Sequence, residues 1–268
     1  MNRLIHTATC FLLVLFASIC TQAQNHLYTA DSAAIVMDRF VTRQNLDAFK
    51  ADSILYIETT ILNNAQGKRD TLRMRRWAAA RSCYRTEVWI DTVQRVGLCS
   101  DGLHHRGLNG KTLRWDSISA EKFYHYHSGY DFRGHLYYWK TSGLEMEYKG
   151  LWNWPGGGRA HRIFVRQPTR FDRNYLFEEG SGLLFFIQEL PTHKEEVQDS
   201  VHADWRAVRE YVPVGGMLLP SVEEYQAGLM RTTVIHSYRY LPLRKEIFDY
   251  RVQIPLDSPL PTSNPNQQ

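Results

Sequence analysis

Cysteine is scarce in this sequence of 268 residues, which contains four. Cys10 and Cys20 lie within the first 23 residues, so Cys83 and Cys99 are the cysteines of the remaining chain. Their spacing is not the short two-cysteine motif that lowers the pKa of a thiol, which argues against a redox role. In an oxidising compartment, however, two thiols can form a disulfide.

Long apolar runs are also lacking after the N-terminus, since none approaches the roughly 20 residues that a membrane helix needs. At the N-terminus, Arg3 precedes an apolar run from Ala8 to Cys20, and the small residues of Thr21-Gln22-Ala23 follow. This pattern predicts a cleaved signal peptide over residues 1–23 and a mature protein that is exported. Ile19 precedes Cys20 where a lipid anchor requires a small residue, which disfavours anchoring there.

A strong charge of either sign is absent. The chain has 32 basic and 28 acidic residues, and removal of the predicted signal peptide would remove one basic residue, Arg3, and no acidic residue. The basic residues are interleaved with acids instead of gathering on one face, as phosphate tracking would require. Nucleic acid is therefore excluded as a partner. The length suits one large β-rich domain with a substantial core.

What the chain has in abundance is alternating apolar and polar residues, typical of strands joined by hairpins. A helix is predicted over residues 31–44, before the strands, and the aromatic segment 115–147 is predicted to hold short helices. These features predict an α+β protein with an antiparallel sheet of about ten or eleven strands and helices on one side. The predicted domain covers residues 24–254, and the prolines from Pro255 onward predict a flexible tail over 255–268.

Cys83 and Cys99 flank a predicted hairpin. If it closes symmetrically about Asp91, Cys83 faces Cys99 on the same side of the sheet, and Tyr84 faces Leu98. A disulfide, or at least adjacency of the two thiols, is predicted. A change of register by one residue would place them on opposite faces.

Motifs that carry catalysis or bind metal are lacking. Ser181 lies between glycines in a hairpin turn, without the strand-to-helix elbow of a catalytic serine. The glycines of segment 156–158 lack the Lys-Ser/Thr of a phosphate loop. Histidine is the best candidate for a metal ligand, but the helical segment 115–147 would splay His125 and His127, while His104, His105 and His135 are near them only in sequence. We expect no enzyme, no metal site and no cofactor.

Several short motifs occur in an order that resembles the periplasmic lipoprotein-carrier superfamily of LolA/LolB-like proteins. The early ones are Trp77 to Arg81, Tyr84 to Ile90 and Leu98-Cys99-Ser100-Asp101-Gly102. The later ones are Tyr175 to Phe177, Gly182-Leu183-Leu184, Trp205 to Tyr211, Gly215-Gly216, Leu219-Pro220, Gly228, Thr232 to Tyr240 and Phe248. The resemblance spans nearly all of the mature chain, and the order of elements carries most of its weight.

The resemblance implies a strongly curved half-barrel whose concave side is covered by helices and holds acyl chains in an apolar cavity. Predicted lining residues are Leu55, Ile57, Met74, Tyr84, Val88, Val96, Leu98, Phe164, Phe185, Ile187, Val234 and Tyr238. Predicted lid residues are Phe123, Tyr126, Tyr130, Phe132, Leu136 and Trp139. An ordinary core filled on both sides of the sheet would use the same residues.

In the carriers that the chain resembles, a basic residue and a proline follow the strand that ends in the tryptophan, and the basic residue serves lipoprotein transfer. Aligned on Trp77, these positions are Ala80 and Arg81, so the motif is absent and Arg81 is the candidate substitute.

The sequence therefore predicts a non-catalytic, monomeric carrier of lipids or lipoproteins, with membrane-bound release or acceptor proteins as partners. Two alternatives stay open. One is an envelope sensor or regulatory module that binds a partner protein with the same fold. The other is a glycan-binding protein that uses Trp152 and Trp154 as a flat aromatic platform.

Overall fold

The computed structural model describes residues 30–50, 52–65, 68–79, 83–90, 93–119, 133–154, 158–166, 172–190 and 204–260. The predicted signal peptide, 1–23, lies outside these residues. None of the helices within them has the length and apolar character that crossing a membrane demands.

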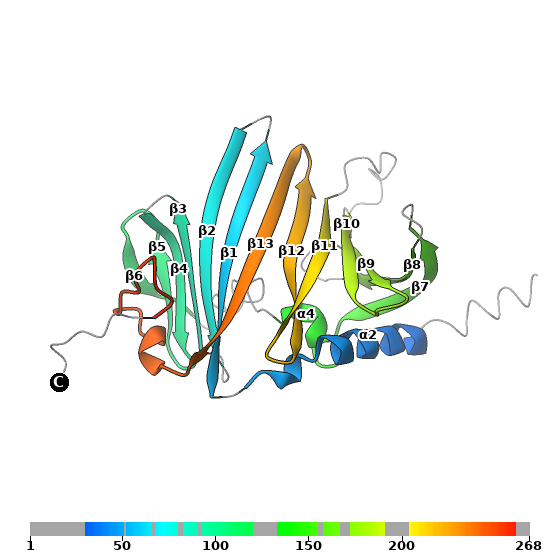
Figure 1. Ribbon diagram of the computed structural model, residues 1–268, viewed down its shortest axis with the longest axis horizontal. Helices are drawn as coiled ribbons and strands as arrows, with labels where there is room; N and C mark the ends of the chain where they lie inside the picture. Colours follow the sequence, from blue (N-terminus) through cyan, green and yellow to red (C-terminus); the bar gives the residue numbers. More distant parts are fainter. Residues whose placement is uncertain are drawn as a thin grey trace, which may run out of the picture.

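Thirteen strands form a single antiparallel sheet, which Figure 1 shows side by side. They are β1 (Ser53–Ala65), β2 (Lys68–Ala79), β3 (Cys83–Ile90), β4 (Val93–Asp101), β5 (His105–Asn109), β6 (Arg114–Ser117), β7 (Glu145–Asn153), β8 (Arg159–Arg166), β9 (Asp172–Glu178), β10 (Leu184–Leu190), β11 (Trp205–Val214), β12 (Met217–Ala227) and β13 (Met230–Pro242). The helical elements are α2 (Ala30–Gln44), η1 (Leu46–Ala48), α4 (Gly134–Tyr137) and η3 (Lys245–Phe248).

The first and last strands, β1 and β13, pair in the middle of the sheet. From this pair, β2 to β6 extend the sheet in one direction and β12 to β7 in the other. The protein is thus mostly β, with one open sheet of thirteen strands. The prediction of a strongly curved half-barrel with ten or eleven strands was wrong in its curvature and its strand count. Among the strands described, β6 and β7 are the two edges and do not pair with each other.

One face of the sheet carries helix α2, and we call it the helix face. The helix was predicted over 31–44 and occupies Ala30–Gln44. Its residues Val36, Met37 and Phe40 pack against Ile163 and Phe177 of the β7–β10 half of the sheet. The rings of Phe40 and Phe177 meet edge to face with centroids 5.2 Å apart. Alternation along β8 and β9 therefore buries one row of side chains beneath the helix.

The opposite face is covered over β1–β4 by the C-terminal strap, residues 244–260, seen in orange and red at one end of the sheet in Figure 1. Ile247, Phe248 and Ile254 pack on Ile54 and Trp77. A flexible tail was predicted from Pro255 onward. For residues 255–260 this prediction was wrong, because Trp77 and Arg75 donate hydrogen bonds to their carbonyl groups. Residues 261–268 lie outside the described part of the chain.

Candidate functional site

The strand register places most of the predicted lining residues on the helix face. Leu55 and Ile57 share this face with their cross-strand partners Tyr240 and Tyr238. Met74, Val88 and Val96 continue it in register across β2, β3 and β4. Ten of the twelve predicted residues lie there: Leu55, Ile57, Met74, Tyr84, Val88, Val96, Leu98, Ile187, Val234 and Tyr238.

Phe164 and Phe185 lie outside this set. Ile163 and Val165 occupy the helix face on β8, so Phe164 between them points to the opposite face, beneath the Lys149 ammonium group. Phe185 falls at the irregularity of β10 and contacts the ring of Trp154 at a centroid distance of 5.3 Å. The sequence could not reveal this assignment, because a β-bulge changes the alternation.

Parts of the helix face are filled by the protein itself. Near η1, Leu55 and Ile57 pack with Leu46, Met217 and Leu219. Near β5, the three residues Ala78, Tyr84 and Leu98 pack with Ile118. Farther along the strands, Val88 is half-buried and Val96 is 41% exposed. The accessible apolar surface among the predicted residues is therefore at the Val88 and Val96 end.

A belt of polar residues crosses the helix face from β2 to β11. We call Arg76, Thr59, His236, Glu223 and Arg206 the polar belt. Arg76 donates to Thr59 Oγ1 (3.3 Å), which contacts His236 Nδ1 (2.9 Å). His236 Nε2 lies 3.4 Å from Glu223 Oε2, and Arg206 forms an ion pair with the same carboxylate. The belt was not predicted. Its sequence signal is a charged residue in the alternating row that faces the helix, such as Arg76 between Met74 and Ala78.

The carboxylate of Glu223 is the electrostatic centre of the belt. Burial alone would raise the pKa of Glu223, but the charge of Arg206 and the hydrogen bond of His236 outweigh burial and hold this pKa well below its usual value. Burial lowers the pKa of His236. At neutral pH, Glu223 is therefore ionised and His236 is neutral.

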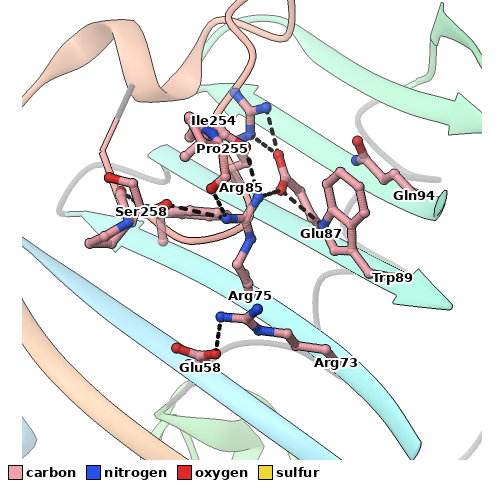
Figure 2. A network of polar contacts seen from close by, with 12 residues as sticks. Glu58, Arg73, Arg75, Arg85, Glu87, Trp89, Gln94, Ile254, Pro255 and Ser258 are labelled. Atoms are coloured by element: carbon pink, nitrogen blue, oxygen red, sulfur yellow. Dashed lines mark hydrogen bonds and ion pairs between the residues drawn. The ribbon is translucent and has the colours of Figure 1, made fainter. Parts of the chain in front are cut away.

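A second buried charge network lies on the opposite face, under the C-terminal strap (Figure 2). Glu87 forms ion pairs with Arg75 and Arg85, each at 2.6 Å, and all three side chains are almost fully buried. Arg75 also donates to the carbonyl oxygen of Ile254 (3.0 Å), and Arg85 to that of Val252 (2.9 Å). Glu87 thus compensates the charges of two arginines that hold the strap on the sheet, so the network is structural.

The cysteines are not joined. Cys83 pairs with Asp101 and Cys99 with Arg85, two residues from the predicted register, and both remain thiols. The predicted disulfide and direct adjacency were wrong for two reasons. Ile90 pairs with Val93, one residue away from symmetry about Asp91, and the register shifts by one more residue between Val88 and Trp89. The thiol of Cys99 donates to the carbonyl oxygen of Phe248 (2.9 Å), and its burial raises its pKa to about 12.

Several predicted residues lie outside the part of the chain that the structure describes. These are Arg81 with Ala80, the lid residues Phe123, Tyr126, Tyr130 and Phe132, and the histidines His125 and His127. Two lid residues are described: Leu136 is buried against the α2 cluster, and Trp139 packs beside it. His104 contacts Asp101 and His105 contacts Ser100; no metal-binding group of three or more His, Cys, Asp or Glu residues occurs in the described ranges.

Trp152 and Trp154 do not form the flat platform expected for a glycan. Their rings meet edge to face at 73°, with centroids 5.1 Å apart. Trp154 also packs against Phe185 and Phe186, and Phe186 stacks on Trp205. These rings form an aromatic cluster on the face opposite to α2.

Ser181 has a turn-forming role. Its hydroxyl donates to the Glu178 carboxylate (2.5 Å) and accepts from the backbone N–H of Leu183 (3.1 Å). It lines an open cleft of about 540 Å³ between α2 and the β9–β10 turn, together with Asp38, Arg39, Thr42, Arg43 and Gly180. The residues that line this cleft are mostly polar, and none of the predicted acyl-lining residues is among them.

The arrangement of strands and helix is similar to three solved structures. A LolA superfamily protein from Nitrosomonas europaea has a TM-score of 0.55 and 9% identity, with 82% of this chain and 97% of that chain covered. The chain has a LolA-like fold. A putative outer membrane lipoprotein-sorting protein domain from Vibrio parahaemolyticus has a TM-score of 0.50 and 9% identity, with coverages of 78% and 94%.

The third similar structure is a DUF1329 family protein from Desulfovibrio piger, with a TM-score of 0.55, 11% identity and coverages of 81% of this chain and 97% of that chain. Neither a family model nor a curated protein matches the sequence. The structural resemblance predicted from the order of motifs is confirmed.

Proposed function

We propose that this protein is an exported, periplasmic, non-catalytic carrier that binds the acyl chains of lipids or lipoproteins on the helix face. The observation that carries the proposal is the set of apolar side chains on that face of a LolA-like fold, with Met74, Val88 and Val96 in register across three strands. Contact with hydrocarbon gives about 0.8 kcal/mol for each buried methylene group, so a chain of ten carbons supplies roughly 8 kcal/mol before ordering costs. Membrane-bound release or acceptor proteins would be its partners.

The first test is whether the protein carries lipid. Native mass spectrometry of protein purified from cells should reveal a bound acyl species, and delipidated protein should take up a fluorescent fatty acid with saturation. Absence of both bound lipid and saturable uptake would contradict the proposal.

A pair of variants tests which face is used. Val96 lies on the helix face and Ile235 on the opposite face, and the two residues are 41% and 42% exposed. Because a charge next to hydrocarbon is costly, we expect Val96→Glu to weaken fatty-acid binding by at least about tenfold. Ile235→Glu should bind as the wild type does. Equal losses in the two variants would place binding elsewhere.

A further inference from the structure

Two polar residues interrupt the apolar part of the helix face at one level. Along β2 and β3, the register pairs Ala78 with Tyr84 and Met74 with Val88. Between these apolar pairs lies Arg76, opposite Thr86. A hydrocarbon chain that follows Met74, Val88 and Val96 would therefore end against a guanidinium group and a hydroxyl group.

The hydroxyl of Thr86 is buried without a hydrogen bond. Thr86 is 0% exposed, and its Oγ1 has no hydrogen-bond partner within the described part of the chain. A buried polar group that lacks a partner costs about 1 to 3 kcal/mol. By contrast, Thr59, His236 and Glu223 of the polar belt bond to one another or to Arg206. Thr86 is thus a polar atom on this face that a ligand could satisfy.

The donors at this level favour a ligand group that accepts hydrogen bonds. Arg206 is paired with Glu223, and the guanidinium group of Arg76 lies opposite Thr86. A guanidinium group only donates hydrogen bonds, and a threonine hydroxyl can donate as well. These two donors suit a ligand oxygen atom that accepts hydrogen bonds, whether that oxygen is neutral or anionic.

We infer that Arg76 and Thr86 form the polar end of the acyl site and bind the carbonyl or carboxylate oxygen at the head of an acyl chain. The hydrocarbon then lies along Met74, Val88 and Val96. This inference rests on the proposed function. It restricts the ligands to acyl groups whose oxygen atom forms hydrogen bonds with the protein, where the proposed function alone requires only a hydrocarbon chain. The oxygen belongs either to a free fatty acid or to an acyl ester.

The experiment compares three ligands with chains of equal length: laurate, methyl laurate and dodecane. Each displaces a fluorescent fatty acid from the delipidated full-length protein. The wild type should bind laurate, methyl laurate or both at least about tenfold more tightly than dodecane. Preference for laurate alone identifies a free carboxylate as the ligand group, and preference for both identifies the carbonyl oxygen of an acyl ester as sufficient.

Variants assign the effect to the two residues. Thr86→Val keeps the side-chain shape and should lose about tenfold in affinity for the preferred ligand while dodecane binding is unchanged. Arg76→Met should lose at least as much. Thr60→Val, on the opposite face, is the matched control, and thermal unfolding verifies that each variant is folded.

The outcomes separate the two claims. If the wild type binds all three ligands equally, or if Thr86→Val binds laurate and methyl laurate as the wild type does, the inference is wrong and the carrier proposal stands. If Thr86→Val also loses affinity for dodecane to the same extent, Thr86 maintains the shape of the site and does not recognise the ligand oxygen, and the inference is again wrong. If no ligand binds to the wild type, the proposed function fails and the inference falls with it.

Discussion

At the scale of single residues, the molecule depends on charges that are buried and paired. Glu87 lies between Arg75 and Arg85 beneath the C-terminal strap, and its side chain is 1% exposed. Removal of one partner from a buried ion network leaves the others uncompensated, which costs far more than the loss of an exposed pair. The network therefore makes the stability of the protein sensitive to a single carboxylate.

We expect Glu87→Gln to lower the free energy of unfolding by about 3 to 5 kcal/mol, because two buried guanidinium groups lose their counter-charge. Glu145→Gln is the control, since Glu145 pairs with Arg166 on the surface with 72% of its side chain exposed; its change should stay within about 0.5 kcal/mol. Urea denaturation at pH 7 measures both. A similar small loss in the two variants would show that the network is not important for stability.

The polar belt predicts a dependence of stability on pH. Burial lowers the pKa of His236 in the folded protein below its ordinary value of 6.5. The unfolded chain therefore takes up a proton at a higher pH than the folded protein does. The contribution of His236 to stability is complete above about pH 6.5 and is lost as the pH falls from there toward the lowered pKa.

His236→Gln should accordingly reduce the slope of unfolding free energy against pH between about pH 7 and pH 5. Glutamine keeps a donor and an acceptor for Thr59 and Glu223. Denaturation curves at several pH values give the slope. Parallel profiles for wild type and His236→Gln would contradict the lowered pKa.

The two cysteines show what residue-level prediction could achieve. The sequence predicted that Cys83 and Cys99 share a face of the sheet, and they do, because a two-residue change of register preserves the alternation. The direct pairing was wrong, because Ile90 pairs with Val93 and not with Thr92, and because the extra residue of a β-bulge has no signature in the alternation of β3 and β4.

At the scale of elements, local pattern predicted α2 within one residue and most hairpins, since 3.6-residue and 2-residue periods arise from neighbours along the chain. The strap was missed because its prolines are typical of a loose tail. Proline lacks a backbone N–H but keeps its carbonyl group, and the strap uses carbonyl groups as acceptors for Arg75, Arg85 and the Trp77 indole.

A truncation after Gln253 tests the strap. It removes Ile254, which is 4% exposed, and the acceptors for Arg75 and Trp77. We expect a loss of at least about 3 kcal/mol, from buried donors left without partners and from lost apolar burial. Denaturant unfolding measures the loss, and limited proteolysis should show faster cleavage.

A chain that ends after Leu260 is the control for this truncation, because it keeps every contact of the strap described here. It should unfold with the stability of the full chain. If the chain that ends at Gln253 is equally stable, the strap does not stabilise the sheet.

At the scale of the whole molecule, the LolA-like architecture was predicted from the order of motifs, and structures with 9% identity share it. Such a fold tolerates wide divergence because alternation and hairpin order define it more than particular side chains do. The open sheet of thirteen strands exceeds the predicted count in part because β6, with four residues, is too short to give a clear pattern.

The sequence by itself determined the helix, the antiparallel sheet and, for ten of twelve lining residues, the shared face, because each follows from periodicity within a short segment. The tertiary structure alone decided the register, the strap and the two buried charge networks. Arg75 bonds to Ile254 across 179 positions of the chain, and Arg76 meets Thr59 and, through it, His236. Whether a buried charge is satisfied depends on partners that only the folded chain brings near, so local pattern cannot encode it.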